Sequence, residues 1–587
     1  MQPVDFTTLM AVCSELRSQW LPSRCEQVYQ RDRYTVCIAL RTLKRRGWLT
    51  LAWHPQAARI HIDAPPPRLP DTFTFSQQLK HQLGGLALVQ IEAIAPWERV
   101  LDLQFAQRPG DPVQWHLYAE IMGKYSNVIL TTANQQIVTA AHQVSESQSS
   151  VRPIQTGDIY QPPPAITDPL PSLDESQADW QERISLIPGG LKKMMMQVYG
   201  GLSSALVRSL IEAADLSPSQ STETLNASDW QRLFQAWQRW LRQLQSGEFQ
   251  PGWTETGYTV TGLGLIEPVE TGQSLLQQYY TYELNLQLFK QLHHRMIQKL
   301  QNLLKKLRQK EATFLTRLEQ SDQADQQRQQ ADLLMAYAYQ WQPGMQSMEL
   351  ADFETGEPVK IKLNPEKNAI QNAQALYKQH QKLKRARRAV EPLLAEVRSE
   401  MNYLEQVEAA LLHLDRYQET ADLQALQEIY EELIAQGYLS DPAQREGSQR
   451  SPEQTEFHRY RTPSGFEVLV GRNNRQNDKL TFSTATDYDL WFHTQEIPGS
   501  HVLLRLEPGA VPDEADLQYT ANLAAYFSRA RQADQVPVIY TEPKNVYKPK
   551  GSKPGMVIYK REQVLWGQPQ AIAQHFDSAA PAPVPVS

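Results

Sequence analysis

Residues 390–411 read VEPLLAEVRSEMNYLEQVEAAL, and this stretch predicts the longest element of the fold. Its apolar residues recur at steps of 4, 3, 4, 3 and 7, at Val390, Leu394, Val397, Met401, Leu404 and Leu411. Such spacing is a heptad seam, which is typical of helices that wind around each other. A second seam precedes it, at Phe289, Leu292, Met296, Leu303, Leu307, Phe314 and Leu318. Residues 276–436 are therefore predicted to form a long antiparallel coiled-coil hairpin.

Helix-breaking residues separate the two seams. Trp341-Gln342-Pro343-Gly344 forms one break, and the stretch 358–365, which begins and ends with proline, forms another. Proline inside a helix removes a hydrogen bond and clashes with the preceding turn. We therefore predict a small tip module between the two arms.

Each arm carries a run of basic residues without an acidic neighbour. Residues 290–310 include Lys299, Lys305 and Lys306, and residues 378–388 include Lys382, Lys384, Arg385, Arg387 and Arg388. If the hairpin folds near residue 350, residue 310 lies opposite roughly residue 390, and we expect both runs at a similar height as a two-sided cationic grip. One such run is usually a solvated face, but two runs brought together repel each other unless a polyanion compensates. The arms are therefore predicted to contact nucleic acid.

The part of the chain before the hairpin predicts two domains. Residues 1–170 combine a helical opening, with apolar residues spaced from Phe6 to Leu16, with short strands separated by Gly, Pro and Asn, which favours hairpins over parallel crossovers. Residues 172–250 predict short helices, in which Gly200-Gly201-Leu202-Ser203 is a glycine turn followed by a serine cap. Such a turn is either a helix-hairpin-helix that aims backbone N–H groups at a phosphate, or a simple packing corner.

The part after the hairpin predicts a linker, a compact module and a tail. Residues 441–456 are a polar linker, and residues 571–587, which end in AAPAPVPVS, are a disordered tail by composition. Residues 457–570 are predicted to be an α+β module, with a strand over 461–471 and a helix over 515–531. Its basic residues Lys544, Lys548, Lys550 and Lys553 are interleaved with two tyrosines, a combination that suits phosphates and unstacked bases of RNA.

Two histidines of this module, His493 and His501, flank a tight turn, and Trp491 lies close to the first of them. No third ligand accompanies them, so no metal site is predicted. We interpret both as neutral hydrogen-bonding groups, with either a structural or an RNA-facing role.

Composition excludes several classes of protein. A net charge of −7, from 58 basic and 65 acidic residues, excludes a uniformly basic nucleic-acid coat but allows local basic patches. Cys13, Cys25 and Cys37 lack both disulfide parity and zinc spacing, and they are predicted to be reduced core residues. The N-terminus does not read as a secretion signal, and the sequence has no apolar run of about 18 residues, so a cytoplasmic protein without membrane contact is expected. A phosphate-binding loop of the G-x-x-x-x-G-K-[ST] type is also missing, and no cofactor is expected.

Several separated strings resemble the NFACT family, which includes bacterial ribosome quality-control factors. They are EIMGKYSNVIL at 120–130, GLS at 201–203, NAQALY at 372–377 with KLKRA at 382–386, and WFH at 491–493 followed by PGSHV at 498–502. The resemblance covers residues 1–570 and implies an α+β multidomain protein. Its parts are an α/β NFACT-N domain, a helix-hairpin-helix domain, the hairpin and an α+β NFACT-R RNA-binding domain.

The resemblance also implies a function. Members bind a large ribosomal subunit that still holds peptidyl-tRNA and recruit alanyl-tRNA, and template-free alanine tails then mark the stalled chain for degradation. The ribosome performs peptidyl transfer, so this chain is expected to position substrates and not to be an enzyme. A small RNA-binding helper protein is compatible with this role.

The resemblance implies particular site residues as well. The family's Asp-Arg pair falls on Glu98-Arg99, one methylene longer, which changes the reach of the carboxylate. The other residues implied to read tRNA are Asp5, Glu120, Ile121 and Met122, although Glu98 and Glu120 also fit plain surface charges. The basic residues of the arms are expected to contact rRNA phosphates, and Trp491, His493, His501 and the four lysines to contact RNA in the last domain.

Three other functions compete with this one. A general RNA-binding scaffold is compatible with the basic patches alone. A DNA glycosylase of the formamidopyrimidine type needs an N-terminal proline amine, but here Gln2 precedes Pro3. A surface fibronectin-binding adhesin, which an older family label suggests, needs an export signal that the sequence does not show.

Overall fold

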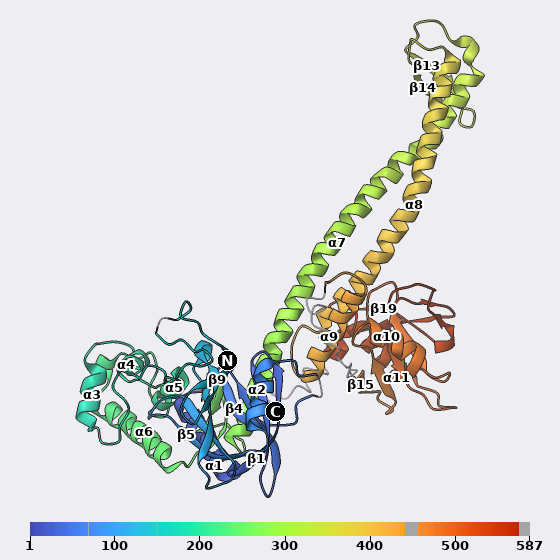
Figure 1. The fold of residues 1–587 in the computed structure, drawn as a ribbon. Coiled ribbons are helices and arrows are strands. Elements are labelled where there is room, and N and C mark those ends of the chain that lie inside the picture. Colours follow the sequence, from blue (N-terminus) through green and yellow to red (C-terminus); the bar gives the residue numbers. More distant parts are fainter. Residues whose placement is uncertain (68–69, 150, 441–455, 574–587) are drawn as a thin grey trace. The chain divides into compact units, whose positions relative to one another are not determined.

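The computed structural model describes residues 1–67, 70–149, 151–440 and 456–573 (Figure 1). The described residues divide into two compact units, 1–284 and 285–573. The predicted mixed α+β architecture is confirmed. The predicted linker at 441–456 and the predicted tail at 571–587 lie, except for residues 456 and 571–573, outside the described residues. Among the described residues, no helix combines the length and apolar character that crossing a bilayer requires.

The described part of the first unit is built on a sheet of nine strands, ordered β4-β3-β2-β1-β5-β6-β7-β8-β9. All neighbouring strands pair antiparallel, as the turn residues between them predicted. Strands β4 and β9 were not predicted from the sequence. The bounds are β1 Ser23–Asp32, β2 Thr35–Arg41, β3 Arg46–Ala52, β4 Arg59–Asp63, β5 Ala87–Ala93, β6 Val100–Ala106, β7 Val113–Glu120, β8 Asn127–Thr132 and β9 Ile137–Ala140.

Two helices cover this sheet. Helix α1 (Phe6–Trp20) buries Leu9, Val12 and Leu16, the positions that its 3.6-residue spacing predicted. Helix α2 (Thr74–Leu83) sets the ring of Phe75 edge-on against Trp53, with centroids 5.7 Å apart. The three cysteines are buried and free, as predicted.

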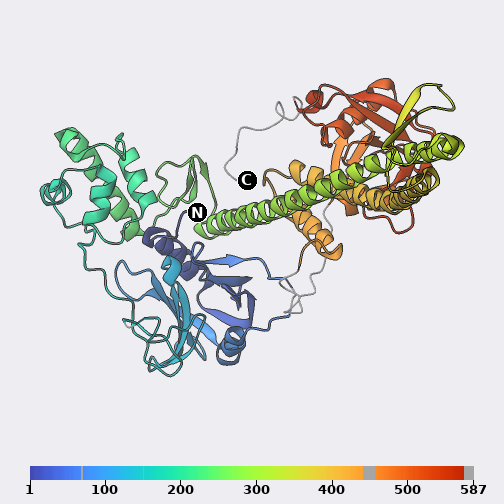
Figure 2. The same ribbon diagram turned by 90° about the horizontal axis from the view of Figure 1, so that it is seen from above.

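A helical module follows in the same unit (Figure 2). Its helices are α3 (Gln177–Ser185), α4 (Leu191–Val198), α5 (Ser204–Glu212) and α6 (Ala227–Ser246). Asn226 and Asp229 form a capping box that starts α6, and Gly247 ends it with a left-handed φ of 73°. Trp180, Trp237 and Trp240 are fully buried at its centre. A small sheet of β10 (Gly252–Thr254), β11 (Gly257–Thr259) and β12 (Glu267–Pro268) leads into the hairpin.

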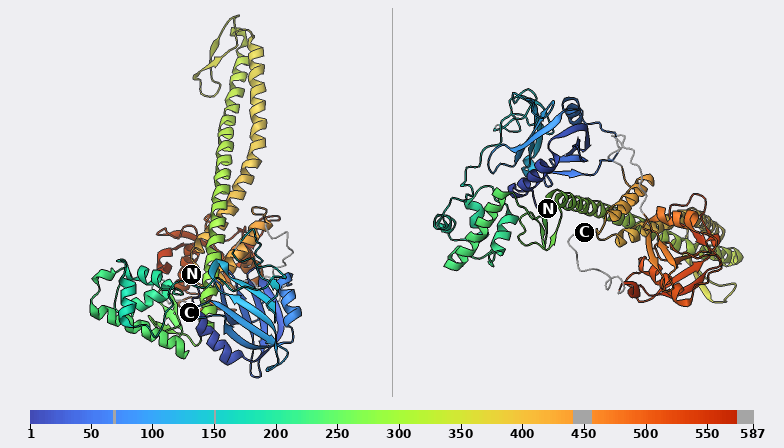
Figure 3. Two further views of the ribbon diagram at one scale, coloured as in Figure 1. Left: turned by 60° about the vertical axis from the view of Figure 1, so that its left-hand side comes forward. Right: turned by 90° about the horizontal axis from the view of Figure 1, so that it is seen from below.

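The hairpin consists of α7 (Gly272–Ala336) and α8 (Ala369–His413), which run side by side over their shared length (Figure 3). The predicted seam is buried in α8 at Val390, Leu394, Val397, Leu404 and Leu411. The tip between the arms is a two-stranded sheet, β13 (Ser347–Ala351) with β14 (Pro358–Lys362). The second arm is shorter than predicted, because α8 ends at His413 and α9 (Thr420–Ala435) is a separate helix.

The predicted height of the two basic runs is wrong. His380 Nδ1 lies 2.8 Å from the carbonyl oxygen of Ala324, and Arg398 donates to Glu311 at 2.7 Å. Lys384 on α8 therefore lies level with a part of α7 that is about 20 Å closer to the tip than Lys306, at 1.5 Å per residue. The contacts set the fold point at about residues 352–355, close to the assumed 350. The prediction failed in pairing the runs, because residue 310 opposite residue 390 already places residues 378–388 beyond the end of the first run. The two runs follow one another along the hairpin and do not form a two-sided grip.

The last domain, in the second unit, is a sheet ordered β15-β16-β18-β17-β19-β22 with α11 (Glu514–Tyr526) packed on it. The strand predicted over 461–471 is in fact two strands joined by a turn with Gly465 at φ 92°. The predicted helix is confirmed as α11. The remaining elements are β15 His458–Arg461, β16 Glu467–Val470, α10 Asn474–Lys479, β17 Leu490–Thr494, β18 Val502–Leu504, β19 Val536–Thr541, β20 Val546–Tyr547, β21 Ile558–Tyr559 and β22 Gln563–Gly567.

Candidate RNA-binding site

A cleft of about 1140 Å³ opens in the first unit where the sheet meets the helical module. Four of the six residues implied to read tRNA line it, namely Asp5, Glu98, Arg99 and Met122. The glycine turn before α5 lines the same cleft through residues 201–204. Segments that are far apart in the sequence thus meet in one hollow.

The loop between β5 and β6 positions Glu98 and Arg99. Trp97 has a left-handed φ of 64°, a strained conformation for a bulky residue. Its indole packs 4.9 Å from the ring of Phe6 and 5.6 Å from that of Trp240, which ties the loop to the helical module. A Cβ at Gly201 would approach this indole to 3.0 Å, so only glycine leaves room there. The strained tryptophan therefore fixes the two residues that follow it.

Glu98 and Arg99 differ in their partners. The guanidinium of Arg99 donates to the carbonyl oxygen of Val4 at 3.3 Å, and its side chain is half-buried. The carboxylate of Glu98 has no hydrogen bond or ion pair to any residue that the structure describes. Glu98 is consequently able to accept hydrogen bonds from a ligand in the cleft.

Asp5 joins two helix N-termini. One carboxylate oxygen accepts the backbone N–H of Thr8 at 2.8 Å and caps α1. The other accepts the hydroxyl of Ser203 at 2.5 Å, and Ser203 in turn accepts the backbone N–H of Leu206 at 3.1 Å and caps α5. Asp5 is only 7% exposed. Its carboxylate therefore holds the cleft together, and both of its oxygens are already occupied.

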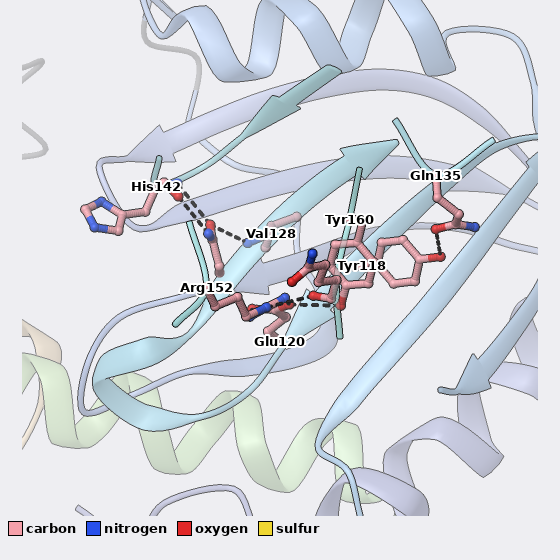
Figure 4. A network of polar contacts seen from close by, with 9 residues as sticks. Tyr118, Glu120, Val128, Gln135, His142, Arg152 and Tyr160 are labelled. Atoms are coloured by element: carbon pink, nitrogen blue, oxygen red, sulfur yellow. Dashed lines mark hydrogen bonds and ion pairs between the residues drawn. The ribbon is translucent and has the colours of Figure 1, made fainter. Parts of the chain in front are cut away.

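Glu120 lies at the end of β7 and is completely buried (Figure 4). Arg152 donates to it through both terminal nitrogens, one of them at 3.0 Å, and the hydroxyl of Tyr160 donates at 2.9 Å. Ile121 is buried as well, whereas Met122 is half-buried at the cleft. Glu120 thus has no exposed surface for a ligand, and its negative charge forms an ion pair with Arg152.

Aromatic rings extend this network along the sheet. The rings of Tyr118 and Tyr160 stack with centroids 3.9 Å apart and an interplanar angle of 3°, and the guanidinium of Arg152 lies 5.4 Å from the Tyr160 ring. Burial, and then the charge of Asp102, raises the pKa of Tyr118 to about 12. Burial, and then the charge of Glu120, raises the pKa of Tyr160 as well. Both tyrosines are therefore neutral at physiological pH and support Arg152 and Glu120.

The rim of the cleft carries exposed groups suited to RNA. Lys124 and Tyr125 lie in the short 3₁₀ turn Gly123–Tyr125, and the ammonium of Lys124 is 4.9 Å from the Tyr125 ring centre. Tyr125 is 70% exposed. The lining of the cleft holds three cations, Arg99, Lys124 and Arg152, and two carboxylates, Asp5 and Glu98. Arg152 is paired with Glu120, so Arg99 and Lys124 are the two lining cations without an ion pair in the described residues. This balance favours a polyanion.

The predicted basic residues of the arms are all exposed. They are Lys299, Lys305, Lys306, Lys382, Lys384, Arg385, Arg387 and Arg388. Arg387 forms an ion pair with Glu391 at 2.8 Å. Elsewhere on the hairpin, Arg308 pairs with Glu405 and Arg398 with Glu311, so part of the arm's charge is compensated internally.

The predicted RNA-facing residues of the last domain fall into three groups, which are buried, half-buried and exposed, and His493 belongs with the buried ones. Trp491 is 0% and His501 1% exposed, and both bond to the hydroxyl of Thr481, which supports the structural alternative. Lys553 is half-buried, with its ammonium 4.7 Å from the ring centres of both Tyr403 and Tyr438. The exposed candidates are Lys544, which pairs with Glu542, Lys548, which pairs with Asp478, and Lys550.

Buried histidines make the second unit sensitive to acid. Burial lowers the pKa of His493 and of His413 to about 4, and it lowers that of His501 well below its ordinary value. The unfolded chain, with histidine pKa values near 6.5, binds protons at pH 5.5 that the folded chain does not bind, so stability falls as pH falls below about 6.5. Acidification from about pH 7 to about pH 5.5 is expected to cost roughly 1 kcal/mol per histidine.

Urea denaturation of the whole chain at these two pH values measures this loss. His493→Gln, which removes one of the titrating groups, is expected to lower stability at pH 7 but to make the pH dependence shallower. A free energy of unfolding that stays constant between the two pH values would contradict the burial of these rings.

Sequence reasoning missed several residues of the cleft. Arg152, Lys124 and Trp97 line it, and Tyr160 supports Arg152 through Glu120, yet none was predicted as a site residue. Lys124 and Tyr125 fall inside the string 120–130 that carried the family resemblance, so they could have been found there. Arg152 lies in a segment without periodicity, and only the folded sheet shows its pairing with Glu120.

Comparisons with known proteins found two matching family models and several relatives. Residues 5–452 match the family described as NFACT N-terminal and middle domains, and residues 456–561 match the NFACT protein RNA binding domain. The Bacillus subtilis protein named Rqc2 homolog RqcH is 29% identical over 575 residues, which cover 95% of this chain and 96% of that protein. The Streptococcus suis protein of the same name is 31% identical over 567 residues, covering 94% and 95%.

A solved structure is similar to part of the chain. It is the C-terminal part of the fibronectin/fibrinogen-binding protein from Streptococcus suis, with 32% identity over 48% of this chain and 95% of that one and a TM-score of 0.37.

Proposed function

The chain belongs to the NFACT family, and from this premise we propose that it is a ribosome quality-control factor that positions tRNA on a stalled large ribosomal subunit. Family membership extends over residues 5–561 apart from a short gap, and the curated relatives carry the name Rqc2 homolog RqcH. The observation that carries the proposal is the cleft of the first unit. It gathers Arg99, Lys124 and Arg152 beside the uncommitted carboxylate of Glu98.

The proposed division of labour follows the charge distribution. The cleft of the first unit holds tRNA, with Arg99 and Glu98 as contacts and Asp5 and Glu120 as supports. The basic residues of the arms and the exposed lysines of the last domain contact rRNA phosphates. The chain performs no bond-making step in this scheme, because the ribosome joins alanine from alanyl-tRNA to the nascent chain. The resulting alanine tail marks that chain for degradation.

Arg99→Ala tests the assignment of the cleft. Loss of one charge-assisted contact is expected to reduce recovery of tRNA about tenfold while leaving recovery of large-subunit RNA unchanged. The measurement is RNA sequencing after mild crosslinking and purification of the tagged chain from cells. The matched control is Arg45→Ala, an exposed arginine outside the cleft.

The RNA recovered with the unmodified chain tests the function itself. Large-subunit rRNA with one enriched tRNA, and little small-subunit rRNA, is the expected result. Equal recovery of both subunits, or no enriched tRNA, would instead support a general RNA-binding scaffold.

A further inference from the structure

Glu120 requires an explanation, because a charge implied to read tRNA is shut off from solvent. It is 0% exposed, and its oxygens accept hydrogen bonds from Arg152 and Tyr160. A carboxylate without exposed surface cannot be reached by a ligand in the cleft, whatever acceptor capacity it retains. Any effect of Glu120 on RNA must therefore pass through a neighbour that reaches the cleft.

Arg152 is that neighbour. It lines the cleft, and its side chain is 13% exposed. Its Nε donates to the carbonyl oxygen of Gln161 at 2.7 Å, and its two terminal nitrogens donate to Glu120. These bonds use three of the five N–H donors of a guanidinium. The group is fixed in position and still able to donate on its cleft side.

The backbone anchors Arg152 and Arg99 to the same place. Glu120 pairs with Val100 across β7 and β6, and the backbone N–H of Ile121 donates to the carbonyl oxygen of Arg99 at 2.9 Å. Arg99 is thus fixed through its main chain at one end of this strand pair. Arg152 is fixed at the same end through the side chain of Glu120, as Figure 4 shows for Arg152 and Glu120. Two guanidinium groups held at one strand end suit a chain of phosphates.

The free energy of folding does not explain why Glu120 and Arg152 form a buried ion pair here. A buried ion pair is often no more stabilising than apolar residues of the same size, because both charges lose their hydration. Tyr160 stacks on Tyr118 and donates a hydrogen bond to Glu120, which fixes the orientation of the Glu120 carboxylate and, through it, of the Arg152 guanidinium. Such an arrangement is expected where a cation must be held ready for a ligand.

We propose that Arg152 contacts a tRNA phosphate in the cleft and that Glu120 and Tyr160 are positioning residues which act through it. This inference rests on the proposed function and deepens it. It assigns to Arg152 the contact that the resemblance implied for Glu120.

A double substitution tests whether Arg152 contacts tRNA or only neutralises the buried charge of Glu120. Arg152→Gln alone leaves a buried carboxylate unpaired and can unfold the domain. The double variant Glu120→Gln with Arg152→Gln removes both charges and keeps hydrogen-bonding groups of similar shape. The probe is a labelled, deacylated alanine tRNA, titrated with the whole purified chain at several salt concentrations, and thermal unfolding checks that each variant folds.

The double variant is expected to bind the probe about tenfold more weakly, with the slope of log K against log salt reduced by about one contact. Arg152→Lys is expected to keep the salt slope but lose part of the affinity, because an ammonium cannot match the Glu120 carboxylate with two hydrogen bonds. Glu120→Gln alone, which retains the cation, is expected to fall between the unmodified chain and the double variant.

Unchanged affinity and salt slope in a folded double variant would overturn the inference and reduce Arg152 to a counter-ion of Glu120. A fall in affinity without a change in slope would overturn it as well. If the unmodified chain does not bind the tRNA, the proposed function itself is contradicted, and the role of Arg152 falls with it. Binding by the unmodified chain together with an unaffected double variant removes only the role of Arg152.

Discussion

Replacing Lys382, Lys384, Arg385 and Arg388 by glutamate is expected to weaken binding to the large ribosomal subunit by about a thousandfold at about 0.1 M salt. All four side chains are exposed, and no ion pair holds them to another residue that the structure describes. Each phosphate contact contributes roughly 0.7–0.9 to the salt slope, so the slope is expected to fall by about three. Arg387 stays unchanged because it pairs with Glu391.

The corresponding glutamine set is the control. It removes the four contacts without adding repulsion and keeps good helix formers, so its binding is expected to lie between that of the unmodified chain and that of the glutamate set. Sedimentation with purified large subunits over a salt series gives affinity and slope, and circular dichroism reports whether α8 is intact. Equal salt slopes for the glutamate set and the unmodified chain would remove the arms from the rRNA contact.

The register of the hairpin adds a second expectation. Lys299, Lys305 and Lys306 lie about 20 Å from the other run along the arm, which exceeds the Debye length of roughly 10 Å in 0.1 M salt. Losses from reversing the two runs are therefore expected to add on a logarithmic scale. A coupling above about 1 kcal/mol would instead favour the two-sided grip that the contacts of His380 and Arg398 contradict.

Local patterns predicted the two long helices of the hairpin, seven strands of the first sheet and the helix of the last domain. Each of these elements depends on residues that are close together in the sequence. Examples are the seam from Val390 to Leu411, the serine cap at Ser203 and the strands separated by Gly, Pro and Asn. The relative height of the two basic runs was predicted wrongly, because a fold point near residue 350 already places residues 378–388 opposite 312–322, beyond the first run. The end of α8 at His413 was missed because helix-like spacing resumes within α9.

The candidate site was predictable only in part. The resemblance led to Asp5, Glu98, Arg99 and Met122, which line one cleft. It gave no indication that Glu120 is buried, because the partner Arg152 lies 32 residues further along the chain. Trp491 and His501 were equally ambiguous, since the same residue types serve as core groups or as RNA contacts until burial is known.

Asp5→Ala is expected to lower the free energy of unfolding of the first unit by about 2–4 kcal/mol. The carboxylate caps α1 through Thr8 and accepts the hydroxyl of Ser203, which itself caps α5. Alanine leaves the Thr8 amide and the Ser203 hydroxyl without this acceptor in a buried place. Because the sheet meets the helical module at this point, the cleft is expected to loosen even where the chain remains folded.

A double-mutant cycle with Ser203→Ala isolates the link between the two helices. The single serine change is expected to cost about 1–2 kcal/mol through loss of the cap on α5. If Asp5 and Ser203 act as one unit, the double variant loses less than the sum of the two, with a coupling of at least about 1 kcal/mol. Strictly additive losses would mean that the 2.5 Å hydrogen bond between them contributes nothing to stability.

Asp5→Asn decides whether the carboxylate also meets RNA. The amide keeps one oxygen acceptor and the shape of the side chain, so the variant is expected to fold and to bind tRNA within about threefold of the unmodified chain. That expectation follows from the two occupied carboxylate oxygens. A folded Asp5→Asn variant with a tenfold loss of tRNA affinity would show that the charge itself faces the ligand. Asp5 would then belong with Arg99 among the contacts, and the junction of α1 and α5 would have to open when tRNA binds.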